Sequence, residues 1–133
     1  MPQNFCVQRS HFNLKNPFSP VPYYLYCRSL ELVLKAFLLA NDFSIKKIID
    51  IRHNLKKALK KARKEGLDGF VVITSYHEKE IRKANKYYDE EKGFEYFDGI
   101  TALRGYQNLP DIHILEQLVL QLVAALKQFC LQA

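Results

Sequence analysis

Cysteines and metal-binding motifs are scarce in this sequence. Its 133 residues include three cysteines, Cys6, Cys27 and Cys130, and no two of them lie close together. An odd number of widely spaced cysteines argues against a disulfide framework and against a zinc ribbon. The four histidines follow no HExxH or comparable spacing. We therefore expect no metal site and no cofactor, and we expect Cys27 and Cys130, which lie in apolar segments, to be small core residues.

Long uncharged apolar runs are also missing. No stretch approaches the roughly 18–20 residues that cross a membrane without charges, and residues 1–12 lack the hydrophobic region of a secretion signal. We therefore expect no membrane association and a soluble, cytoplasmic protein. Apolar residues make up 48% of the chain and charged residues 26%, a composition typical of globular proteins that disfavours disorder. The length suits a single domain, 1–133.

An apolar segment without glycine predicts a helix over residues 22–40. Pro22 stands at its start, where the missing N–H would have no helical partner. The apolar side chains lie on nearly every side of a helical wheel, which predicts burial among other helices. Arg28, Glu31 and Lys35 form one polar stripe on this helix. The stripe is either a water-exposed edge of a core helix or the lining of a polar groove between helices.

Capping residues predict two helices after the first one. Ser44 can cap the segment IKKIIDI, and Asn54 can cap a second helix that ends before Gly66. Prolines interrupt residues 1–21, so we expect an irregular N-terminal arm packed on the helices.

The second half of the chain predicts two further helices. Residues 70–74 are rich in β-branched side chains and favour a strand, but the sequence offers no partner strand. Ser75 and Glu78 form a capping box for a helix that we expect to end near Gly93. A continuous apolar face predicts a helix over about residues 110–131. The width of that face suggests a homodimer formed through this C-terminal helix.

Positive charge is concentrated in one segment. The chain has a net charge of +6, but residues 46–64 contain nine Lys or Arg and one acid, Asp50, so the rest of the chain is slightly acidic. A helix with this charge density either is a solvated face that keeps the protein soluble or is a surface that binds phosphate groups. The candidate binding residues here are Arg52, Lys56, Lys57, Lys60 and Lys64.

Three short motifs follow one another along the chain. The first is S-L-E-L-V-L-K, from Ser29 through Glu31 to Lys35; the second is R-H-N-L, which contains His53; the third is A-N-K-Y-Y, in the helix after Ser75. Over about residues 22–130 the sequence resembles the HEPN domain family (higher eukaryotes and prokaryotes nucleotide-binding), in the branch with an S-x-E-L-x-L-K helix and a G-H-D-L turn. Ser29, Glu31 and Lys35 are therefore candidate binding residues.

The resemblance and the helix pattern imply the same fold class. Both indicate an all-α protein, an antiparallel bundle of four to five helices. The family is commonly dimeric and is associated with RNA cleavage, toxin–antitoxin pairs and nucleotidyltransferase partners. The resemblance therefore implies RNA or a nucleotide as ligand and a nucleotidyltransferase-type antitoxin as partner.

The catalytic motif of the family is not present in its usual form. Active ribonucleases of the family use an Arg and a His with four to six residues between them, near the start of a late helix. The nearest pair here is Arg104 and His113, with eight residues and Pro110 between them, so the two cannot share one helical face. In the turn motif, Arg52 stands where the family usually has Gly, and Asn54 replaces an equally good Asp cap.

His53 has two interpretations. A histidine at a helix start among basic residues is biased toward its neutral form and can act as a general base. Alternatively, His53 packs against helix 22–40 and bonds to Glu31 or Ser29, which would also give the carboxylate of Glu31 a partner.

Two functions from different classes follow. The first is a dimeric binding module that contacts RNA, a nucleotide or an acidic partner protein through the basic helix. The second is a metal-independent endoribonuclease of the toxin–antitoxin type. Its base would be His53 or His113, and its cationic partner would be Arg104, Arg52 or Lys35.

Overall fold

The computed structural model describes residues 20–90 and 108–132, and all structural statements below refer to them. They contain no strand and five α-helices: α2 (Val21–Ala40), α3 (Ile45–Ile51), α4 (Leu55–Lys64), α5 (Ser75–Asn85) and α7 (Ile112–Gln132). A 3₁₀ turn (Leu67–Gly69) follows α4, and a π-helical turn (Lys86–Glu90) extends α5. The all-α prediction is confirmed for this part of the chain. Most of the expected N-terminal arm, Gly93 and Arg104 lie outside it.

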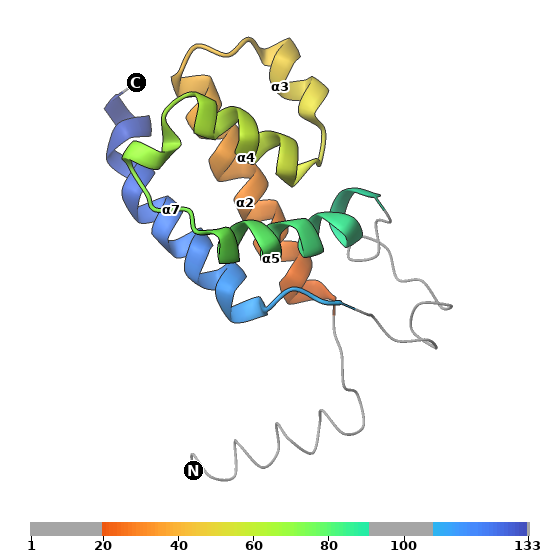
Figure 1. Ribbon diagram of the computed structural model, residues 1–133. Helices are drawn as coiled ribbons and strands as arrows, with labels where there is room; N and C mark the ends of the chain where they lie inside the picture. The colour runs from red at the N-terminus through yellow and green to blue at the C-terminus, as the bar shows by residue number, and fades with distance from the viewer. Residues whose placement is uncertain (1–19, 91–107, 133) are drawn as a thin grey trace.

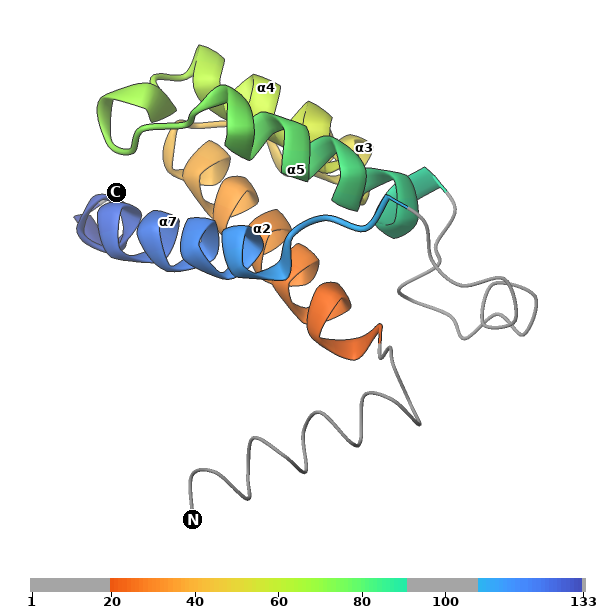
Figure 2. The same ribbon diagram turned by 60° about the horizontal axis from the view of Figure 1, so that its bottom comes forward.

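Helix α2 is the central element of the bundle. It packs against α7 on one side and against α4 on the other, while α5 contacts α4, α7 and α2 (Figure 1). α4 and α5 run in opposite directions, but α2 and α7 run in broadly the same direction (Figures 1 and 2). The antiparallel arrangement expected from the sequence therefore describes α4 and α5 and does not extend to α2 and α7.

The core is formed by the inner faces of these helices. Its largest fully buried aliphatic side chains come from α2, α3, α4, α5, α7 and the 3₁₀ turn: Leu30, Leu34, Leu38, Ile51, Leu55, Leu67, Ile81, Leu115, Leu118 and Leu122. Cys27 is also fully buried, as expected, and burial raises the pKa of its thiol to about 12. A thiol in this state is protonated and unreactive at neutral pH.

The helix ends confirm most of the capping predictions. The side chain of Ser44 accepts the N–H of Lys47 at 3.2 Å, and that of Asn54 accepts the N–H of Lys57 at 3.0 Å. Gly66 follows α4 with φ +97°, a left-handed conformation that glycine adopts without strain. Local side-chain chemistry therefore sets these three boundaries.

The start of α5 differs from the prediction by one residue. The capping box is formed by Thr74 and His77, not by Ser75 and Glu78. The hydroxyl of Thr74 accepts the N–H of His77, and the Nδ1 atom of His77 accepts the N–H of Thr74, both at 3.1 Å. The imidazole thus takes the place of the usual glutamate, and Glu78 is left to pair with Arg63.

Residues 70–74 do not form a strand in the described structure. They are an extended connection in which Val71 and Ile73 are buried, whereas Phe70 and Val72 are exposed. A strand needs a hydrogen-bonded neighbour, and none is present among the described residues. The β-branched side chains serve instead to anchor the connection to the core.

Helix α2 is less completely buried than its composition predicts. Leu25, Leu32 and Leu39 lie seven residues apart and are 55%, 53% and 48% exposed. On α7, Leu120 is 62% exposed and Val123 is 44% exposed. Both long helices therefore carry an apolar outer face that the described bundle does not cover.

Candidate functional site

The carboxylate of Glu31 lies at the centre of a polar cluster between α2, the turn before α4, and the end of α5. Only 2% of the residue is exposed. Its Oε2 atom accepts a hydrogen bond from the Nζ of Lys35 at 2.7 Å and lies 3.4 Å from the guanidinium of Arg28. Its Oε1 atom contacts the Nδ1 of His53 at 3.0 Å and accepts the hydroxyl of Tyr88. The polar stripe of α2 is therefore an interhelical contact.

The charge of Glu31 is stabilised by these donors. Burial of the carboxyl acts to raise its pKa, but hydrogen bonds from Lys35, Tyr88 and His53 outweigh burial and lower the pKa below its usual range. Burial and the bond to Glu31 raise the pKa of Tyr88, so its hydroxyl remains a donor. Because an ionised carboxylate only accepts hydrogen bonds, the proton of the His53 imidazole lies on Nδ1.

A tight turn places His53 against Glu31. The N–H of Asn54 donates to the carbonyl of Ile51 at 3.2 Å, and Arg52 has φ 56° and ψ −130°. These angles match the first central position of a type II′ turn, which normally requires glycine. Lys35 fixes the turn from the other side, because its Nζ donates to the carbonyl of Arg52 at 2.6 Å.

Asn85 joins the end of α5 to the start of α4. It is fully buried, and its Oδ1 atom accepts the N–H of Leu55 at 2.6 Å. Asn54 satisfies a second N–H of the same helix start. The three sequence motifs thus converge on one place, where a carboxylate, a turn and two amide side chains hold α2, α4 and α5 together.

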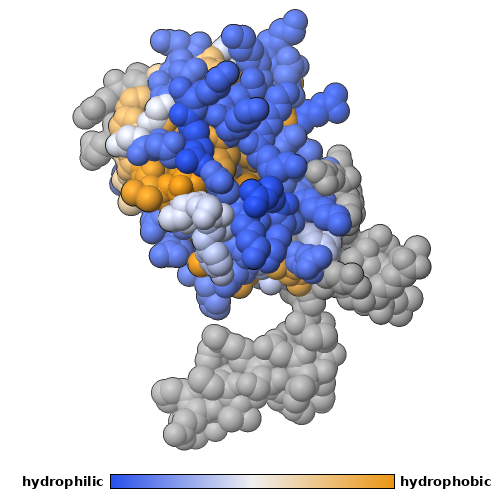
Figure 3. Space-filling view, viewed as in Figure 1, coloured by the Kyte–Doolittle hydropathy of each residue, from blue (hydrophilic) through white to orange (hydrophobic). Residues whose placement is uncertain are grey.

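The basic helix α4 presents its cations on the surface. Its apolar side chains, Leu55, Ala58, Leu59 and Ala62, are buried, so the lysines project outward. Figure 3 shows hydrophilic side chains over most of the described face above α4 and α5. No ion pair joins Lys60, Lys61 or Lys64 to an acid among residues 20–90 and 108–132.

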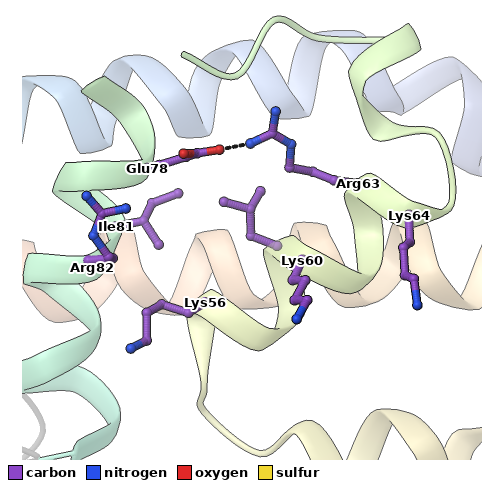
Figure 4. A pocket seen from close by; sticks show the side chains of 8 residues that line it. Lys56, Lys60, Arg63, Lys64, Glu78, Ile81 and Arg82 are labelled. Carbon is purple, nitrogen blue, oxygen red and sulfur yellow. Dashed lines mark hydrogen bonds and ion pairs between the residues drawn. The ribbon is translucent and has the colours of Figure 1, made fainter. Parts of the chain in front are cut away.

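A groove of about 450 Å³ lies between α4 and α5 (Figure 4). Its floor contains the buried side chains of Leu59 and Ile81. Its rim is formed by Lys56, Lys60, Arg63, Lys64, Glu78 and Arg82. Glu78, the one acid among the described lining residues, forms an ion pair with Arg63 across the groove (Figure 4). The groove therefore combines an apolar floor with a positively charged rim.

The structure brings together only part of the predicted site. The expected contact between His53 and Glu31 is present, whereas the hydroxyl of Ser29 donates to the carbonyl of Leu25 and takes no part. His113 is exposed in the first turn of α7, where its backbone N–H donates to Asp111. Among the described residues, no hydrogen bond connects the side chain of His113 to that of His53, so the structure does not join these two candidate bases in one site. Arg104 lies outside the described residues.

Tyr88 and Asn85 are the residues that sequence reasoning failed to place in the site. Both lie in the A-N-K-Y-Y motif, which contributes to the family resemblance but does not by itself indicate contacts with Glu31 or Leu55. Their roles depend on the π-helical turn that follows α5 and on contacts with residues 57 and 30 positions earlier in the chain.

Comparison with known proteins adds no assignment, since no protein family, no characterised protein and no solved structure matches the chain. None of the described helices has the combined length and hydrophobicity needed to cross a membrane. In the part of the chain that the structure describes, no three His, Cys, Asp or Glu residues gather as metal ligands would.

Proposed function

We propose that this chain is a HEPN-like helical module that binds RNA through the basic outer face of α4. The observation that supports this proposal is a group of three lysines on one short helix that have no acidic partner among the described residues: Lys60 and Lys64, which are exposed, and Lys61, which is half-buried. Cations that are not neutralised within the protein are available to phosphates and release counterions when they bind. Phosphate contacts of this kind position a nucleic acid without reading its sequence.

The Glu31 cluster has a structural role in this proposal. It fixes the turn before α4 and thereby the direction of the basic helix. The three motifs that resemble the HEPN family converge on this cluster. Residues from all three motifs form its contacts between helices, and this supports the resemblance. A homodimer formed through the exposed side of α7, with Leu120 and Val123, completes the module. A nucleotidyltransferase-type protein is the partner that the family likeness suggests.

The test is a gel shift with mixed RNA in the presence of a chelator, over a series of salt concentrations. If about four phosphates are bound, the logarithm of the affinity should fall with the logarithm of salt with a slope of roughly −3. The variant Lys60→Ala/Lys61→Ala/Lys64→Ala should flatten this slope by about 2. Its matched control, Lys46→Ala/Lys79→Ala/Lys127→Ala, removes the same charge from exposed sites on α3, α5 and α7. Equal losses in both variants would show that only net charge matters.

The same gels test the ribonuclease alternative. One observation favours His53 over His113 as its base: Glu31 orients the imidazole of His53, whose side chain is 38% exposed. Cleavage that survives the chelator and is lost in His53→Ala would replace the binding module with this enzyme. A salt-sensitive shift without cleavage supports the binding module.

A further inference from the structure

The groove between α4 and α5 has a feature that phosphate binding does not need. Its floor is apolar: Leu59 and Ile81 lie at its base, 5% and 1% exposed, and the hydrocarbon stems of the lining lysines and arginines add apolar surface. Surfaces that bind single-stranded RNA usually place aromatic rings under the bases, and none of the described residues that line this groove is aromatic; its arginines, Arg63 and Arg82, lie at the rim. The apolar floor therefore indicates an occupant with aliphatic side chains.

The rim of the groove defines the charge of that occupant. Lys56, Lys60 and Lys64 recur every four residues along α4, so they form a row about 12 Å long. Arg82 extends the positive charge to the α5 side (Figure 4). Glu78 is neutralised by Arg63. An occupant that fits must place carboxylates at helical spacing on both sides of an apolar stripe.

We propose that this groove is the docking site for an acidic amphipathic helix of a partner protein. Leucine-like side chains at positions i, i+4 and i+7 of that helix would pack over Leu59 and Ile81 and against the hydrocarbon stems of the rim cations. Its flanking Glu or Asp would face Lys60, Lys64 and Arg82. This inference goes beyond RNA binding and rests on a different observation, the apolar floor. Because Lys60 and Lys64 belong to both surfaces, the partner helix and RNA compete.

The test uses fluorescence anisotropy with two labelled synthetic peptides and the full chain. The first peptide, of roughly 20 residues so that its helix is stable enough, carries leucine on one face and glutamate beside it. The second has the same composition in a shuffled order without an apolar face. The amphipathic peptide should bind. The shuffled peptide has the same charge but no apolar face to pack on the floor of the groove, so it should bind at least about tenfold more weakly. Equal binding of the two, or no binding, overturns the proposal.

Two matched pairs of variants locate the peptide. Lys60→Ala/Lys64→Ala removes rim charges, whereas Lys57→Ala/Lys61→Ala removes the same charge from the same helix outside the groove. The first variant should weaken binding about tenfold and the second less than about twofold. On α5, Arg82→Ala should weaken binding and Lys79→Ala should not. Equal effects within a pair would show general charge attraction and overturn the proposal.

Competition separates the failure of this inference from the failure of RNA binding. The amphipathic peptide should release bound RNA, while the shuffled peptide should release much less. If RNA fails to bind and the amphipathic peptide binds in the groove, the RNA proposal falls and this one stands. If RNA binds and the peptide does not, the RNA proposal stands and the groove proposal falls. If the amphipathic peptide binds in the groove, its addition should change the amide chemical shifts of Leu59, Ile81 and Arg82 in a nitrogen-15 spectrum.

Discussion

Glu31 shows how far one residue can be understood from sequence. Its place in a polar stripe of an apolar helix identified it as a group that needs a partner, and the pairing with His53 followed from that need. The hydroxyl of Tyr88 could not be anticipated, because the two residues are 57 positions apart and meet only when α5 packs beside α2. The same applies to Asn85 and the N–H of Leu55.

We expect the contact between Glu31 and His53 to be energetically coupled. Glu31→Gln should lower the free energy of unfolding by about 3 kcal/mol, because Lys35 then loses its charged partner. His53→Ala should lower it by about 1.5 kcal/mol through loss of a charge-assisted hydrogen bond. The double variant should lose about 1 kcal/mol less than the sum. Urea denaturation of the four proteins measures this, and strictly additive losses would mean that the contact does not contribute.

At the scale of the structural element, the turn between α3 and α4 is strained. Arg52 has a positive φ that an L residue rarely adopts, and a glycine would adopt it without a Cβ clash. We expect Arg52→Gly to raise the free energy of unfolding by about 1 kcal/mol. Arg52→Ala, which removes the same charge and keeps the Cβ, should give no such gain. Denaturation midpoints distinguish the two, and an equal gain in both variants would trace the effect to charge.

The capping box of α5 makes this helix sensitive to acid. Burial lowers the pKa of His77 below its ordinary value of 6.5. The unfolded chain therefore binds a proton more readily than the folded one, and stability is lost as the pH falls below 6.5. Protonation also removes the Nδ1 acceptor that holds the N–H of Thr74.

His77→Gln should retain the capping box without titrating. Its stability at pH 8 should lie within about 0.5 kcal/mol of the original, since Gln serves at this capping position. Between pH 6.5 and pH 5 it should lose less stability than the original chain does. Thermal melts over this pH range provide the measurement. Parallel losses in the two proteins would assign the acid sensitivity to other groups.

At the scale of the whole molecule, two apolar outer faces are candidates for the interface of the proposed homodimer. The C-terminal helix was expected to form a homodimer, and Leu120 on α7 is 62% exposed, but Leu32 on α2 is 53% exposed as well. We expect Leu120→Glu to convert a dimer to a monomer, because a buried unpaired carboxylate is costly at an apolar interface. Leu32→Glu, the same change on the other face, should leave the dimer intact.

Light scattering after size-exclusion chromatography measures the mass directly. If Leu32→Glu is monomeric and Leu120→Glu remains a dimer, the dimer interface lies on α2 rather than on α7. A chain that is monomeric before any substitution would remove the dimer from the proposed function.

The helices and the distribution of charge follow from local features of the sequence. Periodicity and capping residues are local properties, so the bounds of α2, α3, α4 and α7 could be predicted to within a few residues, and the lysine-rich surface of α4 followed from its buried face. The β-branched residues 70–74 favoured a strand by composition alone, but the lack of a partner strand argued against one, and the structure has none there.

Most contacts between distant residues depend on how the helices pack and have no counterpart in a local motif. The packing of α5 against α4 created a groove whose apolar floor and cationic rim come from segments about 20 residues apart. The same packing brought Tyr88 to Glu31 on α2 and Asn85 to the start of α4. Contacts between distant segments depend on the angles at which helices pack, and those angles follow from the fit of whole surfaces rather than from any single motif.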